Sequence, residues 1–170
     1  PAALLRRGLV MVPGDRTRDG IFPGLSVAGH LLGQVQAALG PWKVLAQAGD
    51  QARALDLRRE FGVTAPDLQG AIGLLSGGNQ QKVLMARAAA TGAGVYLLDG
   101  PTRGVDVGAR SDIYRWIRSR TEHGAALILA SDDLDELAQI CSRVLCFKNL
   151  RVERELAARD LAPAALAEAL

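Results

Sequence analysis

The stretch LSGGNQQK, residues 75–82, decides the fold because it combines a glycine turn, the start of a helix and several polar side chains. Gly77 and Gly78 let the backbone approach a ligand closely, and the free N–H groups at the start of a helix suit a phosphate. Ser76 adds a hydroxyl group, while Gln80 and Lys82 add polar reach. Taken alone, the same stretch also fits a simple Ser-Gly-Gly turn that caps a helix.

A second stretch, VYLLD (residues 95–99), is a short apolar run that ends in a carboxylate. Such a run is typical of a buried parallel strand, and ligands of α/β sheets bind outside the carboxyl ends of the strands. Burying a carboxylate is costly unless it serves a cation or a hydrogen-bond network. In phosphate-handling folds this carboxylate holds Mg²⁺, usually through water. Asp99 is therefore a predicted magnesium ligand, although an Asp that only caps the next loop is the simpler alternative.

The remaining sequence alternates between strand and helix patterns. Strands are expected at 8–13, 94–98, 125–130, 143–148 and 151–155, and helices at 26–40, 51–61, 79–90, 107–122, 133–140 and 163–170. The apolar run at 125–130 is expected to be a buried strand, like the run at 94–98. This alternation predicts an α/β fold with a mainly parallel sheet. The stretch 20–75 is mostly helical and is expected to be somewhat separate from the residues after it.

Composition narrows the function classes. The chain has 170 residues, of which 49% are apolar and 22% charged, as expected for one globular domain. A net charge of +2 without a Lys/Arg run argues against nucleic acid as a partner. No apolar stretch reaches the ~18 residues of a membrane span, so any membrane role is expected to come through a partner.

The cysteines and histidines are not expected to carry chemistry. Cys141 and Cys146 have no second pair and no adjacent His, so buried free thiols are favoured over a metal site or a disulfide. His30 and His123 are expected to be surface or loop residues rather than catalytic ones.

Together these stretches resemble the ABC ATPase family. LSGGNQQK is similar to its signature motif, VYLLD to its Walker B strand, and GVD (residues 104–106) to its D-loop. The wording of LSGGNQQKV, PTRGVDVGA (101–109) and VPGDRTRDG (12–20) is similar to the second ATPase half of importers for ribose, galactose, xylose and related sugars. The resemblance runs from about Arg7 to the last helix.

The resemblance implies a single partial P-loop NTPase domain over residues 1–170, with a helical subdomain at about 20–75 and an α/β core made by 1–19 and 76–170. It implies ATP and Mg²⁺ as cofactors, each nucleotide being held between the phosphate loop of one domain and the signature motif of another. Carried over by position, the site residues are Ser76, Gly77, Gly78 and Gln80 as nucleotide contacts in trans, Asp99 as a water-mediated Mg²⁺ ligand, Asp106 in the D-loop, and Gly14, Asp15 and Arg16 in the loop that couples to the membrane partner.

The resemblance also implies partners. They are a second ABC ATPase domain, membrane permease subunits and, indirectly, a periplasmic or extracellular sugar-binding protein, and they place the chain on the cytoplasmic face of the plasma membrane. No nucleic acid is expected.

The sequence departs from the family at several positions. No G-x-x-x-x-G-K-[ST] motif (Walker A) occurs in the 170 residues, and it is expected upstream of Pro1. Gly100 stands where the family usually has the Glu that polarises water, and losing a positioned general base typically costs about 10²–10⁴-fold in rate. Gly14 replaces a Gln or Glu, and Asp132 stands at the position of the switch His. No catalytic residue is assigned, and the chain by itself is expected to be inactive as an ATPase.

Three interpretations remain open. The first is an energy-coupling subunit of a sugar importer that contributes its signature residues to a partner's ATP. The second is a degenerate, non-catalytic remnant or interaction module of an ABC ATPase, which the missing Walker A loop, Gly14 and Gly100 favour. The third, an ABC ATPase of DNA maintenance or translation, is disfavoured by the weak net charge and the sugar-type wording.

Overall fold

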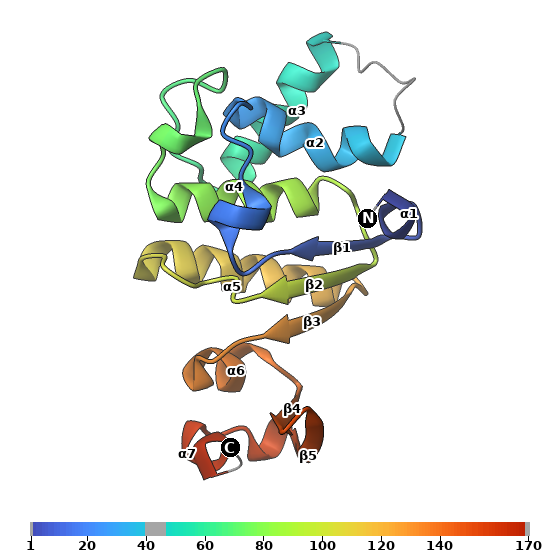
Figure 1. Cartoon of the computed structure of the whole chain (residues 1–170), viewed down its shortest axis with the longest axis vertical. Helices are drawn as coiled ribbons and strands as arrows, with labels where there is room; N and C mark the ends of the chain where they lie inside the picture. Colours follow the sequence, from blue (N-terminus) through green and yellow to red (C-terminus); the bar gives the residue numbers. More distant parts are fainter. Residues whose placement is uncertain (1, 40–46, 169–170) are drawn as a thin grey trace. The chain divides into compact units, whose positions relative to one another are not determined.

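A computed structural model describes residues 2–39 and 47–168 (Figure 1). The chain divides into two compact units, residues 1–128 and 129–170. The division falls inside the last strand of the sheet. It does not separate the helical subdomain expected at about 20–75, which remains a prediction. Gly40, the expected end of one helix, lies outside the described residues, as do residues 169 and 170.

Three strands form one sheet in the order β1 (Leu9–Val12), β2 (Val95–Asp99) and β3 (Ala126–Ala130). β1 and β2 are parallel, with Leu9 opposite Val95 and Val12 opposite Leu98. The strands alternate along the chain with helices α4 (Gly77–Ala89) and α5 (Val107–Glu122). The predicted α/β architecture with a parallel sheet is therefore confirmed.

Helix α4 forms the centre of the first unit. It lies between the sheet and the helices α2 (Val27–Leu39) and α3 (Gln47–Glu60) (Figure 1). Its middle is rich in strong helix formers and is buried over consecutive residues: Val83, Leu84, Met85, Ala86, Arg87, Ala88 and Ala89. Each large apolar side chain buried here contributes about 1.5–3 kcal/mol, so α4 is held mainly by packing on all sides.

Aromatic contacts connect α5 to the sheet and to the end of α3. The rings of Tyr96 and Trp116 meet edge to face with 5.2 Å between centroids, and Phe61 lies 5.8 Å from Trp116. Such pairs contribute about 0.5–1.5 kcal/mol beyond the area that they bury.

The prediction of a buried strand at 125–130 is wrong in one respect. The strand exists, but Ala126, Ile128 and Ala130 are exposed, Ile128 by 62%. β3 is the edge strand of the sheet, and only one of its faces is covered by described residues. An uninterrupted apolar run looks the same whether one or both faces are covered, so the sequence could not distinguish these cases.

The second unit contains a hairpin rather than a further parallel strand. β4 (Arg143–Lys148) and β5 (Arg151–Ala157) are antiparallel, so the expectation that 143–148 continues the parallel sheet is wrong. Asn149 and Leu150 form the turn with φ of 50° and 63°. A two-residue connection is far too short for a parallel crossover.

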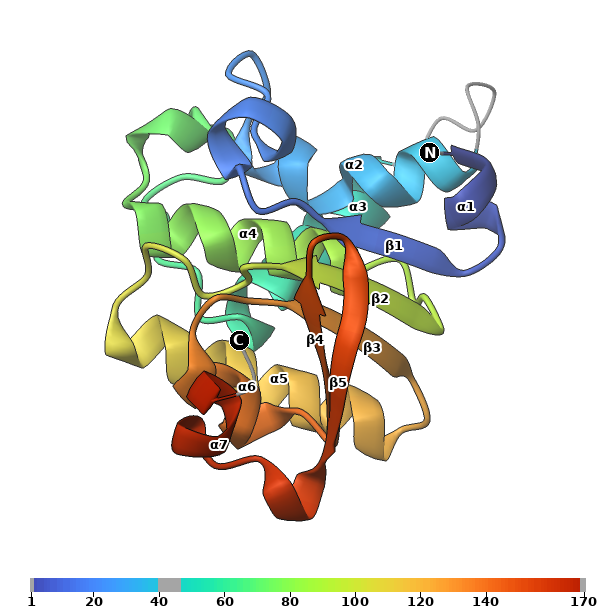
Figure 2. The ribbon, with the colours of Figure 1, turned by 60° about the horizontal axis from the view of Figure 1, so that its bottom comes forward.

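Helices α6 (Leu134–Ile140) and α7 (Pro163–Glu168) complete this unit beside the hairpin (Figure 2). Its small core consists of Leu137, Val144, Cys146, Leu161 and Leu166. Short elements that the sequence did not predict are α1 (Ala2–Arg6), η1 (Arg16–Gly20), η2 (Ile72–Leu74) and η3 (Ala158–Asp160).

Cys146 is buried, Cys141 is half-buried, and both are free thiols, close to the expectation. His123 is exposed at the end of α5, as expected. The expectation for His30 is wrong, because its side chain is only 1% exposed. Within the described part of the chain, none of the helices combines the length and apolar character that crossing a bilayer requires.

Candidate nucleotide-contact site

The start of α4 is capped by Ser76. The Ser76 Oγ accepts hydrogen bonds from the backbone N–H of Asn79 at 3.4 Å and from the Asn79 side-chain Nδ2 at 3.0 Å. The first turn of α4 carries no acidic residue. The partial positive charge that a helix has at its N-terminus is therefore not neutralised by the helix itself.

The two glycines of this turn leave room for side chains from other segments. A Cβ atom at Gly77 would lie 2.7 Å from Nη2 of Arg16, and one at Gly78 would lie 3.1 Å from Oδ2 of Asp106. Real Cβ atoms essentially never approach as closely as the first distance. Two other loops thus bring a cation and a carboxylate directly against the backbone of the signature turn.

Arg16 joins three segments of the first unit. Its Nη1 donates to the carbonyl oxygen of Arg103 at 3.0 Å, and the guanidinium lies against the backbone of Gly77 and Gly104. The sequence placed Arg16 in a loop that couples to a membrane partner. That role remains a prediction, and the contacts of this side chain connect the loop after β1 with the start of α4 and the loop after β2.

Asp106 lies beside the signature turn and caps the next helix. Its Oδ1 accepts from the backbone N–H of Ala109 at 2.9 Å. That hydrogen bond is the largest cause of the lowered pKa of Asp106, to which the positive charge of Lys82 also contributes. The Asp106 carboxylate is therefore ionised at neutral pH while its other oxygen faces Gly78.

Asp99 ends β2 and lies against a glycine from the neighbouring loop. A Cβ at Gly14 would be 2.6 Å from Oδ2 and 2.8 Å from Cγ of Asp99. Among the residues that the structure describes, no group of three or more His, Cys, Asp or Glu could hold a metal. A single carboxylate beside side-chain-free backbone fits Mg²⁺, which keeps several of its waters, and does not fit a metal enclosed by protein ligands.

The next residue, Gly100, has φ of +50°. Its carbonyl oxygen accepts from the N–H of Arg103 at 3.0 Å, which closes a tight turn, and a Cβ would lie 3.5 Å from Cβ and Nε of Arg103. Residues other than glycine rarely adopt this backbone conformation. The position where the family usually has Glu is therefore a left-handed turn in this chain.

Two other residues from the sequence predictions, Asp15 and Asp132, lie at or beside the caps of short helices. Asp15 accepts from the N–H of Arg18 at 3.0 Å and caps the start of η1. Asp132 belongs to the second unit and directly precedes Asp133, which caps α6 by accepting from the N–H of Glu136 at 3.0 Å.

The polar side chains of residues 80–82 make hydrogen bonds and an ion pair within the protein. Gln80 donates from Nε2 to the carbonyl of Leu75 at 3.0 Å, so this amide group supports the loop before α4. Gln81 is buried and donates to the carbonyl of Pro101 at 2.8 Å. Lys82, expected to add polar reach toward a ligand, is paired with Asp112 of α5 at 2.7 Å.

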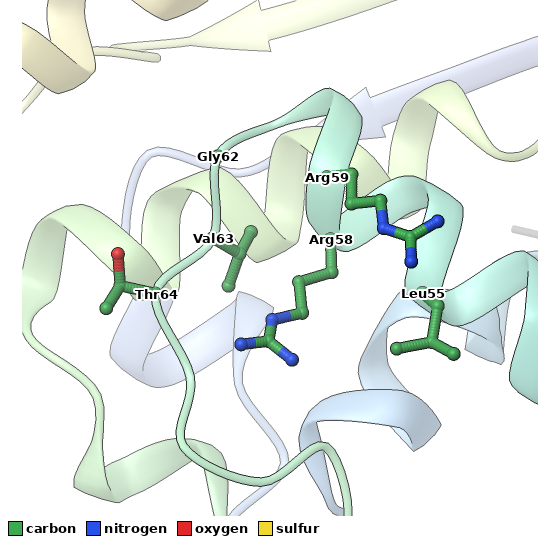
Figure 3. Close-up of a pocket in the computed structure, with 6 residues that line it drawn as sticks. All are labelled: Leu55, Arg58, Arg59, Gly62, Val63 and Thr64. Carbon is green, nitrogen blue, oxygen red and sulfur yellow. The ribbon is translucent and has the colours of Figure 1, made fainter.

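Asn79 is the residue of this site that the sequence analysis missed. Its Oδ1 accepts from the backbone N–H of Thr64 at 2.7 Å, in addition to its contacts with Ser76. Thr64 lines a groove of about 490 Å³ at the end of α3, together with Leu55, Arg58, Arg59, Gly62 and Val63 (Figure 3). The Ser-x-x-Asn spacing, which is that of a capping box, was the available signal.

The sequence profile of the ABC transporter family matches residues 2–103. The chain belongs to this family. It is 38% identical over 161 residues to a putative ribose/galactose/methyl galactoside import ATP-binding protein of Agrobacterium fabrum, covering 95% of the chain and 32% of that protein.

A second relative is an arabinose import ATP-binding protein of Burkholderia ambifaria, 38% identical over 170 residues, with 98% of the chain and 32% of the relative covered. The chain thus spans about a third of the length of these curated ABC relatives. Among solved structures, a dimeric ATP-binding cassette bound to ADP and Pi matches with a TM-score of 0.76 and 22% identity, over 89% of this chain and 63% of the other. This match supports the ABC cassette fold.

Proposed function

We propose that this ABC-family chain is part of the ATP-binding, energy-coupling subunit of a monosaccharide importer. In this proposal, the start of α4 completes the nucleotide site of a second ATPase domain. The relatives named as sugar-import ATP-binding proteins support the transport role. The chain covers only part of them, so activity, substrate and partners are proposed rather than transferred.

The observation that carries the proposal is the chemistry at the start of α4. Ser76 and the glycines Gly77 and Gly78 present a hydroxyl group and backbone N–H donors at a helix N-terminus whose first turn has no acidic side chain. Such an end favours an anion with many oxygens, such as the γ-phosphate of ATP. The Arg16 guanidinium adds positive charge beside Gly77. The Asp106 carboxylate adds negative charge beside Gly78.

In this proposal, the residues around Asp99 bind a metal ion but supply no catalytic base. Asp99 would hold Mg²⁺ through water, and the ion would neutralise charge on the phosphates. Neither Gly14 nor Gly100 offers a side chain that could take a proton from an attacking water. We infer that this chain binds and orients nucleotide for a partner, and that the general base comes from elsewhere.

The membrane partner in this proposal is a permease, approached through the loop at residues 14–16 and the helical stretch 20–75. The described residues of that stretch include the exposed large apolar side chains Phe22, Leu25, Leu55 and Leu74, and exposed apolar side chains are common where proteins dock. The chain would then act at the cytoplasmic face of the membrane, with a sugar-binding protein as an indirect partner.

The test is the affinity of the assembled ATPase for Mg-ATP after Ser76→Ala. Hydrogen bonds to charged groups contribute about 1.5–3 kcal/mol, so we expect affinity to fall by about tenfold or more. Ser111→Ala is the matched control, because Ser111 is an exposed serine on α5. Unchanged affinity in Ser76→Ala would contradict the proposal.

A second candidate, a non-catalytic interaction module without a transport role, is favoured by Gly14 and Gly100. Both positions lack the side chain that the family uses there. Co-purification from the source cells distinguishes the two: recovery with a permease supports the importer subunit, and recovery without one supports the interaction module.

A further inference from the structure

Asn79 connects the cap of α4 to a segment 15 residues earlier in the chain. Its Oδ1 accepts from the backbone N–H of Thr64 at 2.7 Å, and its Nδ2 donates to Oγ of Ser76 at 3.0 Å. A second connection between the same regions comes from Lys82, whose Nζ donates to the carbonyl of Gly62 at 3.4 Å. The chain from 62 to 64 is thus fixed against the first turns of α4.

The orientation of the Asn79 amide follows from chemistry. The oxygen and nitrogen of an Asn side chain are distinguished by their partners. A backbone N–H can only donate, so the atom that faces Thr64 must be the oxygen. The NH₂ group must then face Ser76, as the structure has it.

This orientation determines what the Ser76 hydroxyl group can still do. A hydroxyl group has two lone pairs and one proton. Both contacts of Oγ, from Nδ2 and from the backbone N–H of Asn79, are donations into the lone pairs. Among the hydrogen bonds of residues 2–39 and 47–168, none is donated by the Ser76 hydroxyl group. Ser76 therefore remains available as a hydrogen-bond donor.

We propose that Asn79 is a positioning residue that occupies the acceptor side of Ser76 and directs its hydroxyl proton toward a phosphate oxygen of the nucleotide. This inference rests on the proposed function, because it assumes that the start of α4 meets the phosphate of a second domain's ATP. It adds a specific requirement: the residue at 79 must donate to Ser76 as well as accept from Thr64.

Asn79→Asp and Asn79→Ala separate this role from a structural one. Asp keeps an oxygen for the Thr64 N–H and places a negative charge at a helix N-terminus, which the helix dipole favours. It cannot donate, so its second oxygen accepts the Ser76 proton and turns it away from the ligand. Ala loses the contact with Thr64 but leaves the Ser76 proton free to rotate.

A structural role and a proton-directing role of Asn79 predict opposite orders of Mg-ATP affinity for the Asp and Ala variants. If Asn79 only supports the fold, Asn79→Asp should be milder than Asn79→Ala in both melting temperature and Mg-ATP affinity. If it directs the proton, Asn79→Asp should retain the higher melting temperature yet bind Mg-ATP about tenfold more weakly than wild type, with Asn79→Ala between them, as expected for losing a hydrogen bond to a charged group. The turnover number and the apparent affinity are measured separately in the assembled ATPase.

The Ser76→Ala background removes the remaining ambiguity, which is direct repulsion between a new carboxylate and the phosphate. If Asn79 acts through the hydroxyl group, adding Asn79→Asp to Ser76→Ala should change Mg-ATP affinity by less than about twofold, because the two changes share one interaction. A full additional loss in that background would overturn the inference and leave the proposed function standing. No effect of Ser76→Ala alone would overturn both.

Discussion

The end of β2 and the start of α4 are both lined by glycine, yet their surroundings differ. Asp99 at the end of β2 is flanked by Gly14 and Gly100, where the family usually has polar or acidic side chains. Ser76 at the start of α4 is supported by Asn79, with Arg16 and Asp106 against its neighbouring glycines. Few side chains surround Asp99, which would serve the chain's own nucleotide. Several side chains support the turn at Ser76, which would serve the nucleotide of a partner domain.

The proposed division of labour between two ATPase domains accounts for this difference, whereas general decay does not. Random loss of function would be expected to loosen both places alike. Instead, three separate segments contact the signature turn: Thr64 through its backbone N–H, and Arg16 and Asp106 through their side chains. The two places should therefore respond differently to the same kind of substitution.

Gly14→Ala is expected to have the largest effect on stability. Its Cβ would lie 2.6 Å from Oδ2 and 2.8 Å from Cγ of Asp99, and the short side chain at the strand end has little freedom to move. We expect a loss of about 1–3 kcal/mol in the free energy of unfolding, as for other overpacked sites, measured by urea denaturation.

Gly77→Ala is the matched comparison, since its Cβ would lie 2.7 Å from an atom of similar size, Nη2 of Arg16. That atom is the far end of a long, flexible side chain, so the structure can adjust and stability should change by less than about 1 kcal/mol. Gly33→Ala in α2, with no atom within 4 Å of the added Cβ, should gain about 0.5–1 kcal/mol as a baseline. Equal losses at positions 14 and 77 would contradict the comparison.

Gly100→Glu tests whether the family's usual carboxylate can simply be restored. From sequence, a Glu at this position is expected to return the missing base and raise turnover at least about tenfold. The left-handed backbone at Gly100 changes that expectation, because an L-residue there costs about 1–2 kcal/mol and its Cβ would lie beside Arg103.

We therefore expect Gly100→Glu to lower the free energy of unfolding by about that amount and to leave ATP turnover of the assembled protein within about twofold. Gly100→Asn serves as the control, because Asn tolerates a left-handed backbone better than most residues. A tenfold rise in turnover would contradict this expectation. It would show that the turn at position 100 rearranges so that the new carboxylate can act as a base.

The helices and their starts could be predicted because the signals are local. The helix at 107–122 was placed correctly: Asp106 caps it, and Gly124, with φ of +85°, lies just beyond its end. The hairpin between β4 and β5 was missed as a hairpin because its turn lacks the usual glycine and places Leu150 in a left-handed conformation. Such a conformation is costly for leucine, so composition gives no signal for it.

The position of Asp99 at a strand end could be predicted, whereas its contacts could not. Ligands of α/β sheets bind outside the carboxyl ends of the strands, and Asp99 does end β2. The link from Asn79 to Thr64 and the placement of Arg16 against Gly77 depend on how α3 and η1 pack. Nothing in the spacing of the residues along the chain encodes those distances.

The smallest expected effect concerns the loop that serves both places. Residues 13–26 supply Gly14 to Asp99 and Arg16 to α4, and the far end of this loop is fixed by His30. The backbone N–H of Phe22 donates to Nε2 of His30 at 2.9 Å, while Nδ1 lies 2.9 Å from the carbonyl of Ser26. The neutral ring with its proton on Nδ1 satisfies both contacts.

Burial lowers the pKa of His30 below its ordinary 6.5, and the charge of Arg87 adds to this. As pH falls below 6.5, the unfolded chain takes up the proton before the folded chain does. The contribution of His30 to stability is therefore complete above pH 6.5 and is lost as pH falls toward the lower folded pKa. His30→Gln has no such titration but retains an amide that can pair with the backbone.

We expect wild type to be more stable than His30→Gln at pH 7.5 and the difference in free energy of unfolding to narrow at pH 5.5. Comparing the two proteins at each pH cancels the titration of carboxylates such as Asp106, which is common to both. A difference that stays constant between the two pH values would mean that protonation of His30 does not loosen the loop. If the difference narrows, nucleotide affinity and the Gly14→Ala penalty should both weaken at pH 5.5, because one loop supplies the residues that contact Asp99 and the start of α4.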